Sequence, residues 1–527
     1  MGIYLNQDNT LFEKDVNSPI YVDKTGLIEQ TNKLINTNTQ YVSVSRPRRF
    51  GKSMAANMLT AYYSRGCDSK SLFSNLKIAE SDSFLKHLNK YNVICLNMYN
   101  FVVKTKNIDE MLRYLEEEVL EEFLDEFPEL ARYKRLDLQK ALDKSFAARK
   151  TPFIFVIDEW DSVMRYYQDS ENEQKKYLDY LCALLKDKSY VALAYITGIL
   201  PVKKYGKHSA LNMFTEYSME NQREFAEFTG FTQSEVAALC KEYDMDLNET
   251  KKWYDGYRVR GIDVYNPRSV VLSVTGHDFD NYWTQTETYE ALKVYIKMDF
   301  DGLKQRIEKM IAGEKIAVNT GKFQNDMTSL KSADDVLTLL IHLGYLTYDF
   351  DTKCCWIPNM EVQREFLNCI EDGGWEPVMN AIKQSECCLT ATLCGDSETV
   401  AKIVEQTHQE NTSIIEYHDE NSLACIVTLS YYTAKNKYFV IRELPSGKGY
   451  ADIAFIPRPN EKLPAIVVEL KRESSPSIAV EQIKKREYFD CLKNFSGEIV
   501  LVGINYTVGA DKSDYKKHSC VIERIFK

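Results

Sequence analysis

The chain has 527 residues, of which 44% are hydrophobic and 27% are charged, and its formal net charge is −11. This composition is typical of soluble globular proteins, and the length indicates several domains. The negative charge argues against a uniformly basic coat, so any nucleic-acid contact is expected to be local.

Cysteine and histidine usage argues against disulfide bonds and zinc sites. The 13 cysteines occur singly or as adjacent pairs without C-x-x-C spacing, and the seven histidines are scattered without an H-E-x-x-H motif. The N-terminal residues lack the basic and apolar regions of a signal peptide, and no apolar run approaches the roughly 18 residues of a membrane helix. We therefore expect a cytoplasmic protein with reduced thiols and no membrane-spanning segment.

A phosphate-binding loop is predicted near the N-terminus. Residues 41–45 form a short β-type run, and the loop after them ends in Gly51, Lys52 and Ser53, where a helix begins. In a P-loop, backbone N–H groups at the helix start hold phosphates, the lysine reaches the β- and γ-phosphates, and the hydroxyl binds Mg²⁺. The full pattern G-x-x-x-x-G-K-[ST] requires a glycine where this chain has Arg46, so the motif is incomplete. The alternative is a solvated basic loop before an ordinary helix.

An acidic partner for this loop follows a predicted buried strand. Residues 153–157 are five consecutive apolar residues, and Asp158 and Glu159 come directly after them. A continuous apolar run suits a strand that is buried on both faces of a parallel sheet. Asp158 would hold Mg²⁺ and Glu159 would orient or activate the attacking water, whereas alone the segment would be a core strand with a solvated acidic end. Together the two segments predict a site for ATP or GTP.

The other elements of this half predict a parallel α/β sheet. Strands are expected at 92–98 and 190–198, and helices at 108–150 and 177–185. Strands that alternate with helices are typical of a three-layer sheet with helices on both faces. Thr197 lies near the end of the last strand, where it either senses a γ-phosphate or caps a turn.

The middle of the chain is predicted to be mainly helical. Thr232 and Glu235 form the pattern of a capped helix start, and we interpret the following aromatic and turn residues as a lid or linker that packs on the nucleotide-binding domain. Residues 339–348 and 355–357 resemble the end of a winged-helix module. Such a module reads DNA or only packs, and we favour packing because the stretch is not basic.

Two carboxylates are predicted to meet on a hairpin in the C-terminal part. Strands are expected on either side of a loop at 457–464 that is bounded by prolines. If the hairpin is symmetric about this loop, the numbers of paired residues sum to 921, and Asp452 lies opposite Glu469. Side chains alternate between the faces of a strand, so Lys471 shares the face of Glu469. A one-residue bulge would break this register.

This constellation fits metal-assisted phosphodiester chemistry. Two carboxylates that face each other repel unless a cation lies between them, and Mg²⁺ prefers a few carboxylates and waters. Lys471 would position or help deprotonate a water and stabilise the transition state. The alternative is a Glu469–Lys471 pair on a solvated strand, which the apolar neighbours disfavour. On the next helix Gln482 could hold the water, and the run 484–486 either grips phosphates or covers a solvated face.

The chain contains the motifs Tyr21–Thr25, Ser45–Ser53, Val156–Glu159, Thr197–Gly198 and Tyr254–Tyr257. Together they resemble the bacterial AAA-ATPase-like family. In that family the loop reads R-P-R-R-F-G-K-S, so the absent first glycine is a family trait. Family members commonly end in a domain of the PD-(D/E)XK nuclease superfamily, whose signature is D…E-x-K…Q. This chain is similar to that signature at Gly449–Asp452, Val468–Lys471 and Gln482.

The nuclease resemblance assigns roles to the C-terminal residues. It implies that Asp452 and Glu469 are metal ligands, that Lys471 is the catalytic lysine and that Gln482 supports the site. The acidic residue that the superfamily carries on a preceding helix is Glu416 or Glu420, and the choice stays open.

We predict an α/β protein with ATP and Mg²⁺ as cofactors. ATP would lie on Gly51–Ser53, with Mg²⁺ held through Ser53 and Asp158, and Arg46, Arg48 or Arg49 would add phosphate contacts. The four predicted domains are a parallel three-layer P-loop ATPase domain of the AAA type at 1–228, a helical lid or linker at 229–298, a winged-helix-like module at 299–375 and a restriction-endonuclease-like α/β domain at 376–527.

The favoured hypothesis is an ATP-driven or ATP-gated switch fused to a Mg²⁺-dependent nuclease that cleaves DNA, or alternatively RNA. This architecture also suggests a role in mobile-element or phage conflict, and a homo-oligomer is compatible with it. One rival is a signalling NTPase whose C-terminal domain binds nucleic acid or protein without cutting, which the negative net charge favours and the intact Lys471 disfavours. A second rival is a scaffold that binds nucleotide without turnover, which an intact Glu159 disfavours.

Overall fold

The computed structural model of the chain forms two compact units. The first unit comprises Met1–Lys304 and Lys315–Phe366, and the second comprises Gln305–Glu314 and Leu367–Lys527. Among the described residues, no helix is long and apolar enough to cross a membrane. The structure describes residues 2–526 except 169, 203–210, 221–222, 260–261, 284–291, 293–299, 312, 324–329, 373–375, 411–419, 447–448, 459–460, 486–494, 496 and 508–516.

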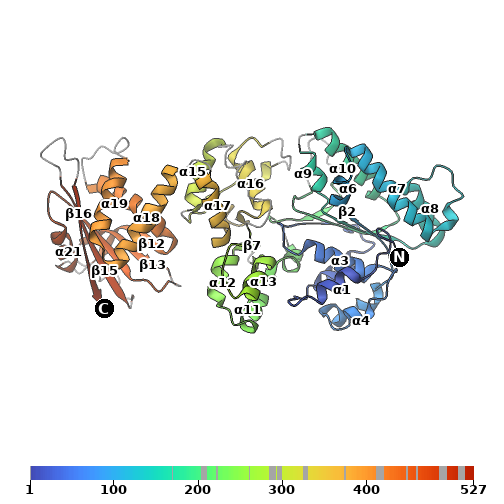
Figure 1. Cartoon of the computed structure of the whole chain (residues 1–527), viewed down its shortest axis with the longest axis horizontal. Coiled ribbons are helices and arrows are strands. Elements are labelled where there is room, and N and C mark those ends of the chain that lie inside the picture. Colours follow the sequence, from blue (N-terminus) through green and yellow to red (C-terminus); the bar gives the residue numbers. More distant parts are fainter. Residues whose placement is uncertain are drawn as a thin grey trace. The chain divides into compact units, whose positions relative to one another are not determined.

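The first unit is built on a parallel sheet of five strands (Figure 1), which confirms the predicted α/β sheet. The strand order is β2-β3-β4-β1-β5, so one strand lies between the P-loop strand β1 and the acidic strand β3. Every residue of β1, β3 and β4 is buried, as expected for strands with helices on both faces. The strands are β1 (Tyr41–Ser45), β2 (Asn92–Asn97), β3 (Phe153–Asp158), β4 (Val191–Gly198) and β5 (Thr215–Tyr217).

Helices form two layers around this sheet (Figure 1). Ile154 and Val156 of β3 face one layer, and Phe155 and Ile157 face the other, as the two-residue period of a strand requires. One layer contains α1 (Thr10–Val16), α2 (Gly26–Leu34), α3 (Lys52–Tyr63), α4 (Lys70–Phe73) and α5 (Phe84–His87). The other contains α6 (Met98–Val102), α7 (Ile108–Glu126), α8 (Leu138–Arg149), α9 (Ser162–Tyr166) and α10 (Glu171–Leu185).

Two of the predicted helices have different bounds in the structure. The stretch 108–150 is divided into α7 and α8 because a short 3₁₀ turn begins at Pro128. Proline has no N–H to continue a helical ladder and its ring clashes with the preceding turn. The helix predicted at 177–185 begins earlier, at Glu171, where Ser170 accepts a hydrogen bond from the backbone N–H of Glu173.

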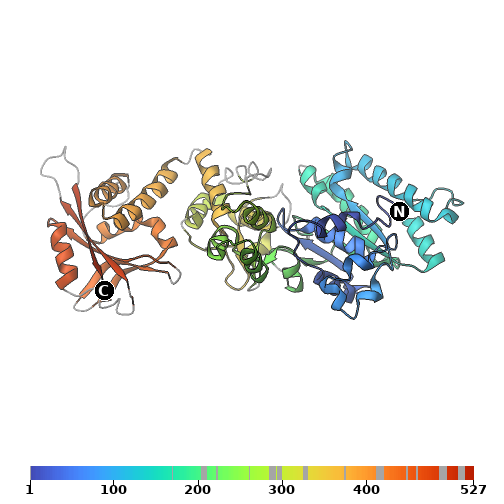
Figure 2. The ribbon, with the colours of Figure 1, turned by 60° about the horizontal axis from the view of Figure 1, so that its bottom comes forward.

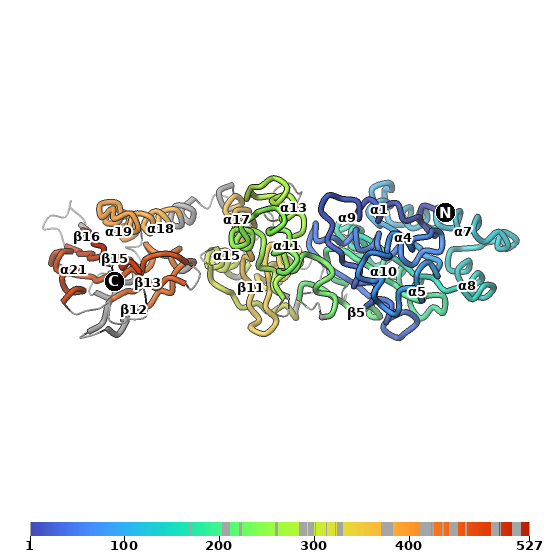
Figure 3. The backbone as a smooth tube through the Cα atoms, turned by 90° about the horizontal axis from the view of Figure 1, so that it is seen from below, coloured from blue at the N-terminus to red at the C-terminus, as the bar shows by residue number. Residues whose placement is uncertain are grey.

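The segment after the sheet forms a small helical part of the first unit. Thr232 and Glu235 make the predicted capping box at the start of α11, which confirms that prediction. In Figure 3, α11 and α13 lie side by side, and they pack on each other together with α12. The elements are β6 (Phe231–Thr232), α11 (Gln233–Glu242), α12 (Leu247–Tyr254), β7 (Tyr257–Val259), β8 (Ile262–Tyr265) and α13 (Pro267–Gly276).

The segment predicted to be winged-helix-like forms a helix and a hairpin. α16 (Ala333–Leu343) is followed by β10 (Thr347–Asp349) and β11 (Cys354–Trp356), and β9 (Ile316–Ala317) pairs with β11. Residues 336–342 of α16 are all buried. A helix with so little free surface packs inside the unit and has no face to place in a DNA groove.

The boundary between the two units falls within α15 (Leu303–Ile311) and α17 (Met360–Asp372). The first unit contains both the sheet and most of the segments predicted as a lid and a winged-helix-like module. The division of the sequence into four domains therefore stays a prediction.

The second unit is a mixed five-stranded sheet with helices on both faces (Figure 2). β14 and β15 are parallel and the other neighbours are antiparallel. One face packs on α18 (Glu376–Cys394), α19 (Ser397–Glu410) and α20 (Glu420–Ser430), and the other packs on α21 (Pro476–Lys485). The strands follow in order as β12 (Tyr438–Ser446), β13 (Gly449–Pro457), β14 (Ala465–Arg472), β15 (Glu498–Thr507) and β16 (Lys517–Phe526).

The predicted register of the C-terminal hairpin is confirmed. Ile453 pairs with Val468, and the next two pairs continue this register, so the numbers of paired residues sum to 921. No bulge interrupts these three pairs. The β13–β14 hairpin therefore brings the segment of Asp452 beside the segment of Glu469.

Candidate nucleotide site and candidate nuclease site

The predicted P-loop connects β1 to α3. Gly51 precedes α3 with a φ of 83°, a left-handed conformation that glycine adopts without strain. No heavy atom lies within 4 Å of the position of a Cβ at Gly51, so the backbone conformation and not the space requires glycine there. Gly51 supplies no capping side chain, so the first N–H groups of α3 are suited to an anion.

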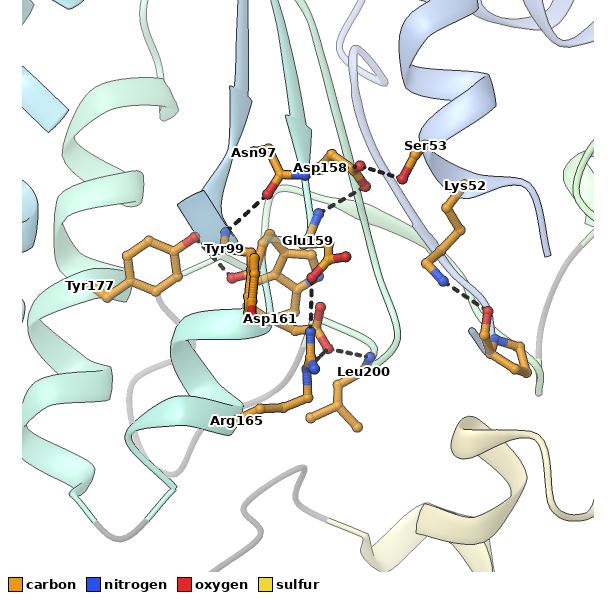
Figure 4. A network of polar contacts seen from close by, with 12 residues as sticks. Lys52, Ser53, Asn97, Tyr99, Asp158, Glu159, Asp161, Arg165, Tyr177 and Leu200 are labelled. Atoms are coloured by element: carbon orange, nitrogen blue, oxygen red, sulfur yellow. Dashed lines mark hydrogen bonds and ion pairs between the residues drawn. The ribbon is translucent and has the colours of Figure 1, made fainter. Parts of the chain in front are cut away.

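Ser53 and Asp158 are brought together at the carboxyl edge of the sheet (Figure 4). The Ser53 hydroxyl donates to Asp158 Oδ2 at 2.7 Å, and the Asn97 side-chain amide donates to the same oxygen at 3.5 Å. Burial raises the pKa of Asp158 above its usual range, although the Ser53 and Lys52 contacts favour the carboxylate. A hydroxyl beside a carboxylate is a donor set that suits hydrated Mg²⁺. Asn97, at the end of β2, was not predicted from the sequence.

Lys52 lies in the loop that it would use to bind phosphate. Its Nζ donates to the carbonyl of Pro47 at 2.8 Å. Burial lowers the pKa of the ammonium to about 8, although the nearby Asp161 and Asp158 counteract this effect. The Lys52 ammonium therefore lies inside the predicted site, where the nearby carboxylates of Asp161, Asp158 and Glu159 favour its charged form.

Glu159 belongs to a polar network beyond Asp158 (Figure 4). Its backbone has a φ of 49°, and its N–H donates to Asp158 Oδ1 at 2.9 Å. Its carboxylate accepts a hydrogen bond from Arg165 Nη2 at 3.3 Å, and Arg165 Nε also donates to Asp161 Oδ2 at 3.2 Å. Sequence reasoning missed Asp161 and Arg165. Their i,i+4 spacing directly after the acidic strand was a signal that could have identified the pair.

Two of the predicted phosphate-contacting residues are used elsewhere. The buried Arg46 side chain donates to the carbonyls of Ser45 and Tyr217 at 2.8 Å each and to that of Phe225 at 3.4 Å. Thr197 is fully buried, and its hydroxyl donates to the carbonyl of Val44 at 2.9 Å. These hydrogen bonds hold the loop and the ends of neighbouring strands in place. In this structure the side chains of Arg46 and Thr197 therefore stabilise the fold around the site.

Arg48 and Arg49 remain at the surface of the loop. Both are partly exposed, and Arg49 has a φ of 69°. Partial burial lowers the pKa of Arg49, and the charges of Arg268 and Arg48 lower it further. This local excess of positive charge suits a phosphate.

The loop also packs on the helical part of the first unit. The rings of Phe50 and Tyr257 meet edge to face at 5.2 Å, and the Tyr257 hydroxyl donates to the carbonyl of Gly344 at 2.8 Å. A Cβ at Gly344 would lie 2.6 Å from Pro47 Cβ. Tyr257, the last residue of the Tyr254–Tyr257 motif, therefore connects the P-loop to the end of α16.

The predicted nuclease residues lie on the face of the second sheet that packs on α21. Asp452 Oδ2 accepts the backbone N–H of Leu470 at 2.7 Å. Glu469 is buried, and its Oε1 accepts hydrogen bonds from Lys471 Nζ at 3.0 Å and from Gln482 Nε2. The hairpin and α21 therefore bring Glu469, Lys471 and Gln482 together, and Asp452 is hydrogen-bonded to the backbone of the residue that follows Glu469.

The donor set of this site consists of two carboxylates, which fits Mg²⁺ that keeps several waters. Among the described residues no three His, Cys, Asp or Glu side chains are grouped as a metal site. Glu416 lies outside the described residues, and the side chain of Glu420 does as well. The metal ligands Asp452 and Glu469 therefore stay a prediction.

The basic run on α21 is paired with carboxylates. Lys484 contacts Glu523, and Lys485 lies 3.8 Å from Glu481. These contacts favour the interpretation as a solvated helix face, and Arg486 lies outside the described residues.

The two sites define a protein that combines a P-loop ATPase-like domain with a nuclease-like domain, and comparisons with known families agree. The family described as predicted AAA-ATPase matches residues 11–207, and the PD-(D/E)XK nuclease superfamily matches residues 418–512. The chain therefore contains an N-terminal AAA-ATPase-like domain and a C-terminal domain of the PD-(D/E)XK nuclease superfamily, as its motifs suggested.

A curated relative gives no further information on activity. The chain is 26% identical over 279 residues to an uncharacterised protein in the vnfD 5′ region of Azotobacter chroococcum mcd 1. The match covers 51% of each chain, so it spans about half the length of this relative.

Proposed function

We propose that the first unit binds and hydrolyses ATP with Mg²⁺ and that the second unit is a metal-dependent nuclease acting on DNA. The observation that carries the first half is the 2.7 Å contact between Ser53 and Asp158, because it joins the two motifs across an intervening strand. The observation that carries the second half is the grouping of Lys471 and Gln482 on Glu469.

Each residue of the nucleotide site has a role in this proposal. The N–H groups at the start of α3 hold the phosphates, and Lys52 turns from the Pro47 carbonyl to a phosphate oxygen. Ser53 and Asp158 would hold Mg²⁺, and the bound ion would neutralise charge on the phosphates. Glu159 orients the attacking water and accepts its proton, and Arg48 and Arg49 add positive charge at the mouth of the loop.

In the second unit Asp452 and Glu469 would hold the metal. Bound Mg²⁺ supplies Lewis-acid activation of the phosphodiester and of a water. Lys471 positions that water and stabilises the negative charge that develops on the phosphate. Gln482 keeps the Glu469 carboxylate in place, because its amide donates to Oε1 of this side chain.

An assay of both activities with site-directed variants tests the proposal. Lys52→Ala should abolish nucleotide binding, and Asp158→Asn should abolish hydrolysis. Lys471→Ala should abolish cleavage of DNA and leave ATP hydrolysis unchanged, and Lys484→Ala is the control because that lysine is paired with a carboxylate away from Glu469. Cleavage that survives Lys471→Ala shows that the assigned nuclease site is wrong.

A non-cutting C-terminal domain is the second candidate function. The pairing of Lys484 and Lys485 with carboxylates favours it, because these lysines then contribute little net charge toward a phosphate backbone. In this case ATP hydrolysis would be measurable while DNA and RNA stay intact, and the protein would act as a signalling switch.

A further inference from the structure

Arg165 holds two carboxylates of the nucleotide site at the same time. It lies in the last turn of α9, and its side chain is 21% exposed. Its Nε donates to Asp161 Oδ2 at 3.2 Å, and its Nη2 donates to Glu159 Oε2 at 3.3 Å. The guanidinium therefore bridges a fully buried carboxylate and a partly exposed one (Figure 4).

Asp161 gives Arg165 a rigid support. The same Asp161 oxygen accepts the backbone N–H of Leu200 at 3.0 Å, and the carbonyl of Leu200 accepts the Ser45 hydroxyl at 3.1 Å. A Cβ at Gly198 would lie 2.4 Å from Asp161 Oδ1, so the end of β4 is shaped around this carboxylate. Arg165 is therefore fixed to the ends of β4 and β1.

Glu159 is the member of this network that can move. Its side chain is 37% exposed, whereas that of Asp161 is 0% exposed. A glutamate has three side-chain torsions, and a half-exposed one samples several rotamers unless a partner restricts it. Arg165 supplies this restriction from a fixed position, and it does so on the carboxylate assigned to the attacking water.

We propose that Arg165 is a positioning residue that sets the orientation of Glu159 and thereby the rate of nucleotide hydrolysis, while it contributes little to nucleotide binding. This inference rests on the proposed function, because it requires that Glu159 activates the water. A carboxylate displaced by about 1 Å can cost a reaction on the order of 100-fold in rate. We therefore expect the effect of Arg165 in kcat and not in the KM for ATP.

A double-mutant cycle on the full-length chain tests the assignment. Arg165→Ala should lower kcat for ATP hydrolysis by about 10–100-fold and change KM by less than about threefold. In the Glu159→Gln background, the same substitution should cause no further loss, because it acts only through Glu159. Arg165→Lys keeps the charge and should recover part of the rate.

Arg149→Ala is the matched control. Arg149 also holds a carboxylate from the same unit, with Nε 3.0 Å from Glu129 Oε1, and is 33% exposed. Arg149→Ala should leave kcat unchanged. This result would show that the loss of kcat in Arg165→Ala comes from the Arg165–Glu159 pair and not from the removal of any ion pair of the unit. If thermal melting shows that the Arg165→Ala variant is not folded, the double-mutant cycle is measured with Arg165→Lys.

Three results would overturn the inference. The first is an unchanged or higher kcat in Arg165→Ala, and the second is an equal loss in the wild-type and Glu159→Gln backgrounds. The third is a loss that appears in KM alone, because Arg165 would then be a phosphate contact. Absence of ATP hydrolysis in the wild-type protein is distinct from these, since it overturns the proposed function together with the inference.

Discussion

Substitution of Gly344 tests whether the P-loop is packed on the end of α16. Gly344 has a φ of 87°, and a Cβ added there would lie 2.6 Å from Pro47 Cβ and 3.0 Å from Trp283 Cη2. A left-handed conformation costs a residue with a Cβ about 1–2 kcal/mol. Overpacking at a buried contact adds about 1–3 kcal/mol, so Gly344→Ala should lower the free energy of unfolding by about 2–5 kcal/mol.

A second substitution separates the two contributions. Pro47→Gly removes the Cβ that the new methyl group would meet, so in this background Gly344→Ala should cost about 1–2 kcal/mol less. Pro47 belongs to the loop that is proposed to hold the phosphates, so displacement of Pro47 by Gly344→Ala should also weaken ATP binding.

Urea-induced unfolding followed by tryptophan fluorescence measures these differences. The signal reports mainly on the first unit, because four of the five tryptophans belong to it, namely Trp160, Trp253, Trp283 and Trp356. An equal cost of Gly344→Ala in both backgrounds would refute the packing of Pro47 on Gly344.

Three further predictions concern single residues. Ser53→Ala should raise the Mg²⁺ concentration for half-maximal ATP hydrolysis by about tenfold, because it removes the hydroxyl that is hydrogen-bonded to Asp158. An unchanged Mg²⁺ titration would contradict this role. Arg46→Lys should lower the free energy of unfolding by about 2–4 kcal/mol in urea titrations, while the KM for ATP changes little. The reason is that the three carbonyls are bound by two separate guanidinium nitrogens, and the single nitrogen of a lysine cannot take both positions. Burial raises the pKa of Glu361 to about 8, so the folded state keeps a proton that the unfolded state loses once the pH exceeds the ordinary pKa of a glutamate. The free energy of unfolding should therefore fall as the pH rises from about 5 to 8. Glu361→Gln should flatten this slope in denaturation measured across that range.

The structural features that could be predicted from the sequence depend on local patterns. The register of the β13–β14 hairpin follows from its loop, because the positions of two strands around a short connection fix their pairing. The capping box formed by Thr232 and Glu235 is likewise local, since it needs only an i,i+3 spacing at the start of a helix.

The side-chain roles that could not be predicted from the sequence depend on contacts between residues that are far apart in the chain. Arg46 has the residue type and position of a phosphate ligand, yet carbonyls of Tyr217 and Phe225, far along the chain, enclose its guanidinium. Asp161 and Arg165 form a recognisable pair only once Glu159 and the end of β4 are placed beside them. Tertiary packing decided each of these roles.

Cleavage of single-stranded DNA, duplex DNA and RNA with Mg²⁺, each with and without ATP, tests the central claim most directly. The wild-type protein should cut DNA, Asp452→Ala should not, and both should hydrolyse ATP at the same rate. An effect of ATP on cleavage that Lys52→Ala removes would connect the two units functionally. ATP hydrolysis without cleavage of any of the three substrates, or cleavage that is equal in Asp452→Ala and the wild-type protein, would contradict the account.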